Sequence, residues 1–132
     1  MEKTLMIIKP DAVAAGRIGE ILARAEREGF AITGLRMLLL SKEQAEAFYA
    51  VHRDRPFFAP LVKYMSSGPV VVGRLERENA VEHWRKVIGS TDPPKADPGT
   101  IRRMFGASIE ANAVHGSDSP QNGEIETKFF FA

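Results

Sequence analysis

The chain of 132 residues contains no cysteine, no long apolar run and no marked excess of charge of either sign. Without cysteine it has no disulfide, no thiolate nucleophile and no cysteine-ligated metal, which suits a reducing compartment. The 18 Lys and Arg residues are balanced by 17 Asp and Glu residues, so the net charge of +1 provides no general field that attracts nucleic acid or a membrane. Any anion must therefore bind through a local group of side chains.

Common targeting and ligand-binding motifs are also missing. The apolar run 4–8 is too short for a signal peptide or a membrane-spanning helix. The 3 histidines lack the close spacing of a zinc motif, and the chain has neither a Gly-x-x-x-x-Gly-Lys-Ser/Thr phosphate loop nor a strand-linked Gly-x-Gly-x-x-Gly. We expect a cytoplasmic protein with no membrane partner and no protein-bound metal centre, in which side chains would hold any nucleotide.

Length and hydrophobic pattern indicate one globular domain, residues 1–132. The apolar fraction of 44% and the charged fraction of 27% are ordinary values, and the chain has no repeat or linker. Short apolar runs predict strands over 4–8, 31–40, 70–72 and 111–115. Helical spacing and capping residues predict helices over 18–25, after the capping box at Ser41, through Leu61 and Met65, after a cap at Asn79, and from Pro120.

This order of elements is the β-α-β-β-α-β pattern of a ferredoxin-like fold. We therefore predict an α+β protein with a four-stranded antiparallel sheet covered by helices, and an inserted helical hairpin between the middle strands. In such a fold, helices cover one face of the sheet. We expect the other face to stay partly open, as a substrate cleft or a subunit interface.

The segment 112–118 has the side chains best suited to chemistry. It places an amide, an imidazole, a hydroxyl and a carboxylate around Gly116. A neutral imidazole, with a reference pKa of about 6.5, is a good nucleophile near neutral pH when its neighbours fix which ring nitrogen carries the proton. Ser117, Asp118 and an acid further along the chain are candidates for that task. By itself, however, a His beside a Gly is more often part of a surface turn, and surface positions also explain His52 and His83.

Cations stand at the ends of several expected elements and would bind a polyanion if the sheet brought them together: Lys9, Arg55, Arg85 and Arg102. The alternative is that each is solvated or caps a helix.

Phe57 follows a proline and either stacks on a planar ring or packs in the core. Thr91, in the proline-rich segment 89–100, either donates to a phosphate or shapes an Asp-Pro turn. We interpret that segment as a functional loop.

Five motifs, taken together, closely resemble the nucleoside diphosphate kinase family. They are Ile8-Lys9-Pro10-Asp11, Arg55-Pro56-Phe57-Phe58, Ser67-Gly68-Pro69-Val70-Val71, Pro98-Gly99-Thr100-Ile101-Arg102 and Asn112 to Ser119. The match covers essentially the whole chain in the family's order, and the run His115 to Ser119 is the family's signature.

The resemblance implies transfer of the γ-phosphate of a nucleoside triphosphate, mainly ATP, to a nucleoside diphosphate. The reaction would be ping-pong through a phosphohistidine on His115 and would maintain NTP and dNTP pools. Ser117 and Glu126 would lie behind the imidazole, with the carboxylate accepting from one ring nitrogen. The nucleotide itself would be held by further residues: Lys9 and Asn112 at the sugar 3′-hydroxyl, Tyr49 hydrogen-bonded near Lys9, Phe57 on the base, and Arg85, Thr91 and Arg102 on the phosphates.

The resemblance also implies a cofactor and an assembly. The family uses Mg²⁺ bound chiefly through the nucleotide's phosphates, with Asp118 able to reach the ion through water. Homo-oligomers are the family rule, either tetramers or hexamers built from a common dimer. The chain stops at Ala132 where most relatives run on, which leaves the number of subunits open.

A few positions depart from the family's pattern. Arg103 and Met104 replace the usual Gly-Asp, Val51 stands where an acid is frequent, and Ala12 replaces a frequent glycine.

Two other functions stay open from the residues alone. One is a catalytically silent, nucleotide-binding ferredoxin-like module, which would have no need of a nucleophile. The other is nucleic-acid binding through Phe57 and the arginines, which the near-neutral charge disfavours.

Overall fold

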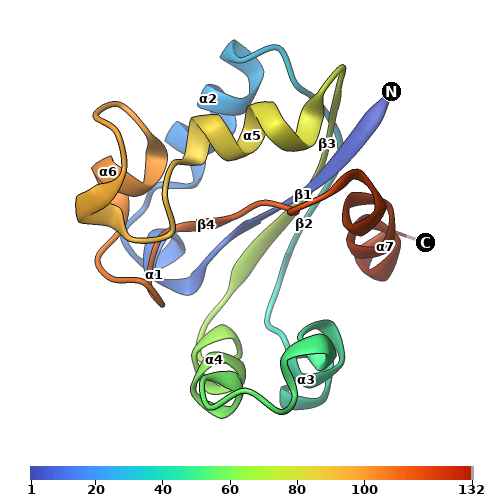
Figure 1. Ribbon diagram of the computed structural model, residues 1–132, viewed down its shortest axis with the longest axis vertical. Helices are drawn as coiled ribbons and strands as arrows, with labels where there is room; N and C mark the ends of the chain where they lie inside the picture. The colour runs from blue at the N-terminus through green and yellow to red at the C-terminus, as the bar shows by residue number, and fades with distance from the viewer. Residues whose placement is uncertain (132) are drawn as a thin grey trace.

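Four antiparallel strands form the sheet, in the order β2-β3-β1-β4. The strands are β1 (Glu2–Ile8), β2 (Ala31–Leu38), β3 (Val70–Arg77) and β4 (Val114–His115). They are seen in the computed structural model, which describes residues 1–131 (Figure 1). The order and the antiparallel pairing confirm the predicted ferredoxin-like α+β fold.

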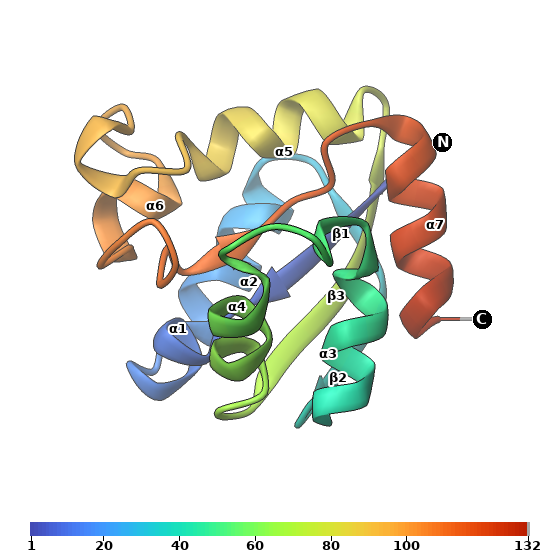
Figure 2. The ribbon, with the colours of Figure 1, turned by 60° about the horizontal axis from the view of Figure 1, so that its bottom comes forward.

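Seven α-helices and two short 3₁₀ turns connect the strands in residues 1–131. They are α1 (Pro10–Ala14), α2 (Ile18–Arg27), α3 (Lys42–Phe48), η1 (Ala50–His52), α4 (Phe58–Met65), α5 (Ala80–Ile88), η2 (Pro93–Lys95), α6 (Ile101–Phe105) and α7 (Pro120–Phe130). The predicted inserted hairpin is α3 and α4, which lie side by side in Figure 2. Within the described residues no helix has the length and apolarity to cross a membrane.

Both faces of the sheet carry an apolar core. On one face Met6, Ile8 and Leu75 pack with Trp84 of α5 and Ile21 of α2. The opposite face packs against the hairpin and α7, through a second cluster that contains Leu5, Ile7, Val70, Met65 and Phe130. Figure 1 shows this two-sided arrangement. The expectation that one face stays partly open is therefore wrong for β1 and β3, because α7 and the hairpin cover it.

The predicted elements formed with some changes at their ends. The capping box of α3 is complete, since Ser41 accepts from Gln44 N–H and the Gln44 side chain accepts from Ser41 N–H. Strand β4 is shorter than predicted because the residues before Val114 form a turn in which Ala113 has φ +76°. Helices α1 and α6 were not predicted, because five residues are too few to show an apolar period.

Asn79 precedes α5 as predicted but does not cap it with its side chain. Its backbone is left-handed, with φ +57°, and its side chain makes no capping hydrogen bond. The carboxylate of Glu2 instead accepts from Val81 N–H at 2.8 Å and satisfies the first turn of α5. A residue 79 positions earlier in the chain therefore caps this helix, and local sequence could not reveal it.

Gly123 lets α7 approach β1 more closely than any other residue would allow. A Cβ atom added at this position would lie 2.1 Å from the carbonyl oxygen of Lys3. The low helix propensity of glycine would otherwise weaken α7. The missing side chain thus sets the distance between helix and strand.

We predict that Gly123→Ala lowers the free energy of unfolding by about 2 kcal/mol or more, because helix or strand backbone must shift to admit the methyl group. Urea denaturation measures this change. Gly19→Ala is the matched control, since its Cβ would meet nothing within 4 Å and α2 should gain roughly 0.5 to 1 kcal/mol from the substitution. Equal effects of the two substitutions would contradict this account of Gly123.

Candidate active site

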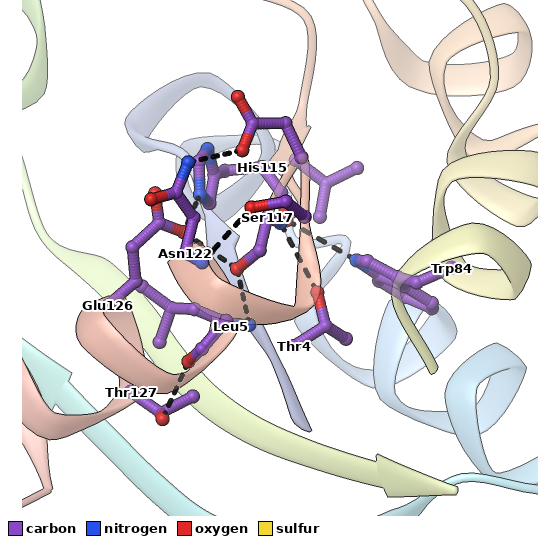
Figure 3. Close-up of polar contacts among 12 residues, drawn as sticks. Thr4, Leu5, Trp84, His115, Ser117, Asn122, Glu126 and Thr127 are labelled. Carbon is purple, nitrogen blue, oxygen red and sulfur yellow. Dashed lines mark hydrogen bonds and ion pairs between the residues drawn. The ribbon is translucent and has the colours of Figure 1, made fainter. Parts of the chain in front are cut away.

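The side chain of His115 is held by a carboxylate from another element. His115 ends β4, where it pairs with Ile7 of β1, and Glu126 lies on α7. The distance between His115 Nε2 and Glu126 Oε1 is 2.9 Å (Figure 3). Because an ionised carboxylate only accepts hydrogen bonds, Nε2 must carry the proton in the neutral ring. The lone pair then lies on Nδ1, which has no hydrogen-bond partner in residues 1–131.

Ser117 fixes the position of that carboxylate. Its hydroxyl donates to Glu126 Oε1 at 2.7 Å and accepts from Leu5 N–H at 3.0 Å. The backbone N–H of Ser117 in turn donates to Thr4 Oγ1 at 3.2 Å, and Ser117 is completely buried. Figure 3 shows His115, Ser117 and Glu126 converging beside β1. The buried strand therefore anchors the group that orients the imidazole.

The remaining contacts of His115 restrict its ring and backbone. The carbonyl oxygen of His115 accepts from Trp84 Nε1 at 3.3 Å, and its ring lies edge-on to Phe48 with centroids 5.8 Å apart. A cavity of about 120 Å³ adjoins the ring and is also lined by Tyr49, His52 and Asp118. The side chain keeps 19% of its surface exposed, so a small group can reach it from solvent.

Lys9 and Asn112 form a buried pair near this histidine. Lys9 Nζ donates to Asn112 Oδ1 at 2.8 Å, and Asn112 Nδ2 donates to the carbonyl oxygen of Thr91 at 3.0 Å. Burial, and secondarily the charge of Arg102, lowers the pKa of Lys9 to about 8. The amino group is thus a desolvated donor, and the nearby carboxylates of Asp11 and Glu110 offset only part of the effect of burial on its pKa.

Arg102 is the second buried cation. Its Nη1 donates to Gly89 O at 3.0 Å and its Nη2 to Val114 O at 2.9 Å, while Nε is buried without a partner among the described residues. Burial, with a smaller effect from Arg85, lowers its pKa to about 10. The two arginines and Thr91 line a cavity of about 440 Å³. This arrangement places cationic groups with incomplete compensation around a space that can hold an anion.

Other predicted residues lie around these groups with different exposure. Phe57 is the residue before α4, 47% of its surface is exposed, and its ring lies 5.3 Å from that of His52. Asp118 is exposed and accepts from Asn122 Nδ2 at 2.5 Å. Arg55 is exposed and lines neither of the cavities near His115 and Arg102. The structure thus does not gather all four predicted cations.

Tyr49 was expected to hydrogen-bond near Lys9, but its hydroxyl makes no hydrogen bond within residues 1–131. Tyr49 is buried in the core beneath the hairpin and its ring packs against Phe48 at 4.9 Å. Burial raises the pKa of its hydroxyl, so the phenol stays neutral. Tyr49 does line the cavity next to His115.

The residues that depart from the family's pattern have defined places. Arg103 Nη1 donates to the carbonyl of Ala96 at 3.0 Å, so this added cation braces the loop 93–96 instead of projecting into the larger cavity. Met104 and Val51 are 51% and 85% exposed. Val51 lines the small cavity beside His115.

Two polar residues near the site were not predicted. Asp11 accepts from Ala113 N–H at 3.1 Å, and the Tyr64 hydroxyl donates to the same carboxylate. The only local signal was the Pro-Asp pair after the first strand. The partners of Asp11 lie 53 and 102 residues away, so this contact could not be predicted from local sequence.

We predict that the buried charge of Lys9 makes stability depend on pH. The pKa of the folded state, about 8, lies below the ordinary value of 10.5, so the unfolded chain binds more protons between these values and rising pH favours folding. Compared with Lys9→Met, the wild type should gain about 1 to 3 kcal/mol of unfolding free energy between pH 8 and pH 10. Denaturant titrations at both pH values test this, and a constant difference would refute it.

Comparison with known proteins assigns the chain to a family. The family model described as nucleoside diphosphate kinase matches residues 2–132. The chain is 58% identical over 131 residues to the nucleoside diphosphate kinase of Halorhodospira halophila, with 99% of this chain and 93% of the relative covered. It is 60% identical to that of Campylobacter jejuni, with 99% and 96% covered.

Solved structures agree with this result. The Aquifex aeolicus nucleoside diphosphate kinase superposes with a TM-score of 0.97 at 48% identity, over 99% of this chain and 95% of that chain. The Encephalitozoon cuniculi nucleoside diphosphate kinase superposes with a TM-score of 0.95 at 37% identity, over 99% and 89%. The chain therefore belongs to the nucleoside diphosphate kinase family.

Proposed function

We propose that this chain transfers the γ-phosphate of a nucleoside triphosphate, mainly ATP, to a nucleoside diphosphate through a phosphohistidine on His115. The observation that carries the proposal is the bond from His115 Nε2 to Glu126, which leaves the lone pair on Nδ1 free to attack phosphorus. Each half-reaction would accept nucleotides with different bases. The enzyme would therefore maintain the NTP and dNTP pools.

The bond changes in the two half-reactions balance. Nδ1 of His115 attacks the γ-phosphorus, a P–N bond forms, the P–O bond to the β-phosphate breaks, and the first nucleoside diphosphate leaves. A second nucleoside diphosphate then attacks the phosphohistidine with its terminal phosphate oxygen, and the P–N bond breaks. During attack the ring gains positive charge, which the Glu126 carboxylate stabilises because it accepts from the opposite nitrogen. Ser117 keeps this carboxylate in place.

The cationic cavity fits the phosphates. We assign the phosphates to Arg85, Thr91 and Arg102, which line one cavity. Arg102 has a buried Nε without a partner among the described residues, so an oxyanion that reaches it would satisfy both its charge and its donor. Positioning and charge neutralisation are most of what phosphoryl transfer requires.

The nucleoside would lie between the two buried polar residues and an exposed aromatic ring. We assign Lys9 and Asn112 to the sugar 3′-hydroxyl, since an amine donor and an amide already lie 2.8 Å apart there. Phe57 would stack on the base with its exposed face, and stacking tolerates any base. Tyr49 would support this region through packing, because it lines the cavity beside His115 without bonding to Lys9.

We propose Mg²⁺ as the cofactor, carried in on the phosphates of the nucleotide. Kinases of this family act on nucleotides and generally use a divalent metal. The exposed carboxylate of Asp118 lines the cavity beside His115 and suits a water-mediated contact to such an ion. When bound, the ion would neutralise charge on the phosphate oxygens.

We also propose a cytoplasmic homo-oligomer. Strand β2 is at the edge of the sheet, and Leu35, Met37 and Leu39 on it or just beyond it are 48%, 59% and 62% exposed. An edge strand with such apolar side chains favours contact with another copy of the chain. Whether dimers assemble into tetramers or hexamers is a question for sedimentation velocity.

The rival functions predict other behaviour. A catalytically silent module would bind nucleotides but would never take up phosphate. A nucleic-acid-binding protein would show a steep salt dependence of binding. The complete set of nucleophile, orienting carboxylate and cationic cavity favours the enzyme over both.

We predict that the wild type becomes phosphorylated when incubated with γ-labelled ATP and Mg²⁺, whereas His115→Ala does not. The label should be acid-labile, as expected of a P–N bond, and addition of unlabelled GDP should release it as labelled GTP. His83→Ala is the matched control, because His83 contacts Glu28 just after α2 and lines neither of the two cavities. Chelation of Mg²⁺ with EDTA should suppress labelling. Binding of ATP without uptake of label would leave the silent module as the explanation.

We predict that Glu126→Gln slows labelling by roughly ten- to a hundredfold. The neutral amide stabilises a positive ring less than a carboxylate does, and its NH₂ group can donate to Nε2 and shift the proton to Nδ1. Single-turnover labelling with ATP measures the rate. Glu124→Gln on the same helix is the control, because Glu124 makes only a surface contact of 3.6 Å with Lys3. Similar rates for Glu126→Gln and the wild type would remove Glu126 from the mechanism.

A further inference from the structure

The turn that precedes His115 contains a residue in an unfavourable backbone conformation. Ala113 has φ +76°, in the left-handed region that side chains other than glycine rarely adopt, and it is completely buried. Such a conformation costs on the order of 1 kcal/mol and persists only when its surroundings impose it. Ala113 follows Asn112 directly, so the groups that hold this turn also determine where the Asn112 amide points.

Residues on both sides of Pro10 hold the turn. The Ala113 N–H donates to Asp11 Oδ2 at 3.1 Å, and its carbonyl accepts from Lys9 N–H at 2.9 Å. Lys9 also donates through its side chain to Asn112. Lys9 and Asp11 therefore bind the N–H and the carbonyl of Ala113 and the side chain of Asn112.

The second oxygen of Asp11 is bound by the helical hairpin. The hydroxyl of Tyr64 donates to Asp11 Oδ1, and the same hydroxyl accepts from Asp11 N–H at 3.1 Å. Tyr64 lies on α4, about two turns after Phe57 at the start of that helix. The Asp11 carboxylate thus joins α4 to the turn, with one oxygen for each.

We propose that Asp11 and Tyr64 are positioning residues that hold the Phe57 helix and the Lys9–Asn112 pair in one fixed relation. This inference rests on the proposed function, in which Phe57 binds the base while Lys9 and Asn112 bind the sugar. A nucleoside that contacts both parts needs their separation to be set before the phosphate reaches His115. The contact between Asp11 and Tyr64 is the hydrogen-bonded link that sets it.

The chemistry of the pair suits a fixed link. Burial and the neighbouring Asp11 carboxylate raise the pKa of Tyr64, so the phenol keeps its proton and remains a donor. A hydrogen bond from a neutral phenol to a carboxylate is stronger than one between neutral groups. The ring of Tyr64 packs against the core on that face of the sheet, so removal of the hydroxyl alone leaves the helix attached by apolar contacts.

We predict that Tyr64→Phe reduces labelling of His115 by γ-labelled ATP and Mg²⁺ by about tenfold, because the loss of a hydrogen bond to a charged group loosens the nucleoside contacts. Phosphoramidate is the second donor, since it carries neither sugar nor base. Its P–N bond breaks as ammonia leaves and a new P–N bond forms to Nδ1. Labelling by phosphoramidate should stay within about twofold of wild type.

Two further variants sharpen this test. Asp11→Asn should show the same difference between donors, and the double variant should be no worse than the more severe single one, since both changes break one link. Ser66→Ala is the control, because it removes another hydroxyl of the α4 region that bonds only to its own backbone, at Val62 O and Lys63 O, and should behave as wild type.

The outcomes separate this inference from the proposed function. ATP labelling of Tyr64→Phe within about twofold of wild type, or an equal loss with both donors, would overturn the positioning role. Failure of the wild type to take label from ATP would overturn the proposed function itself.

Discussion

The burial of β1 on both of its faces is the constraint on which the rest of the molecule depends. Residues from Thr4 to Lys9 are buried, with α2 and α5 packed on one face of the sheet and α7 with the hairpin on the other. Where such a strand ends, the buried backbone N–H and C=O groups that follow it still need hydrogen-bond partners. Strand β1 ends at Ile8, and the next residue, Lys9, binds the turn before His115 through both its backbone and its side chain. The core and the site are therefore parts of one packing arrangement.

This arrangement buries charge that does not help the fold. Burial lowers the pKa of both Lys9 and Arg102. Each buried charge therefore lowers the stability of the protein when no ligand is bound. Bound phosphates would compensate the charge of Arg102, which lines the larger cavity. Part of the free energy lost by burying Arg102 would therefore be recovered when the phosphates bind.

The sequence predicted this molecule where the signal was local or where the resemblance supplied it. Apolar runs and the capping box at Ser41 located strands and helices correctly, and the position of Glu126 beside His115 agrees with the resemblance. Contacts between distant residues could not be predicted, as with Glu2 capping α5 and Tyr64 reaching Asp11. Helix propensity alone predicts that Gly123 only weakens α7. Its close contact with the backbone of Lys3, which requires a glycine, could not be predicted from the sequence.

Gly123 links the packing of α7 on β1 to the position of the Glu126 carboxylate. Glu126 lies three residues after it on α7, so the closest approach of helix and strand occurs within one turn of the carboxylate that holds the imidazole. The Ser117 hydroxyl spans the same gap, since it binds Leu5 of β1 and Glu126 of α7 at once. A helix displaced outward by one methyl group would lengthen the bonds from Glu126 to Ser117 and to His115 together. The orientation of the His115 ring therefore depends on the backbone contact between α7 and β1 as well as on Glu126 and Ser117.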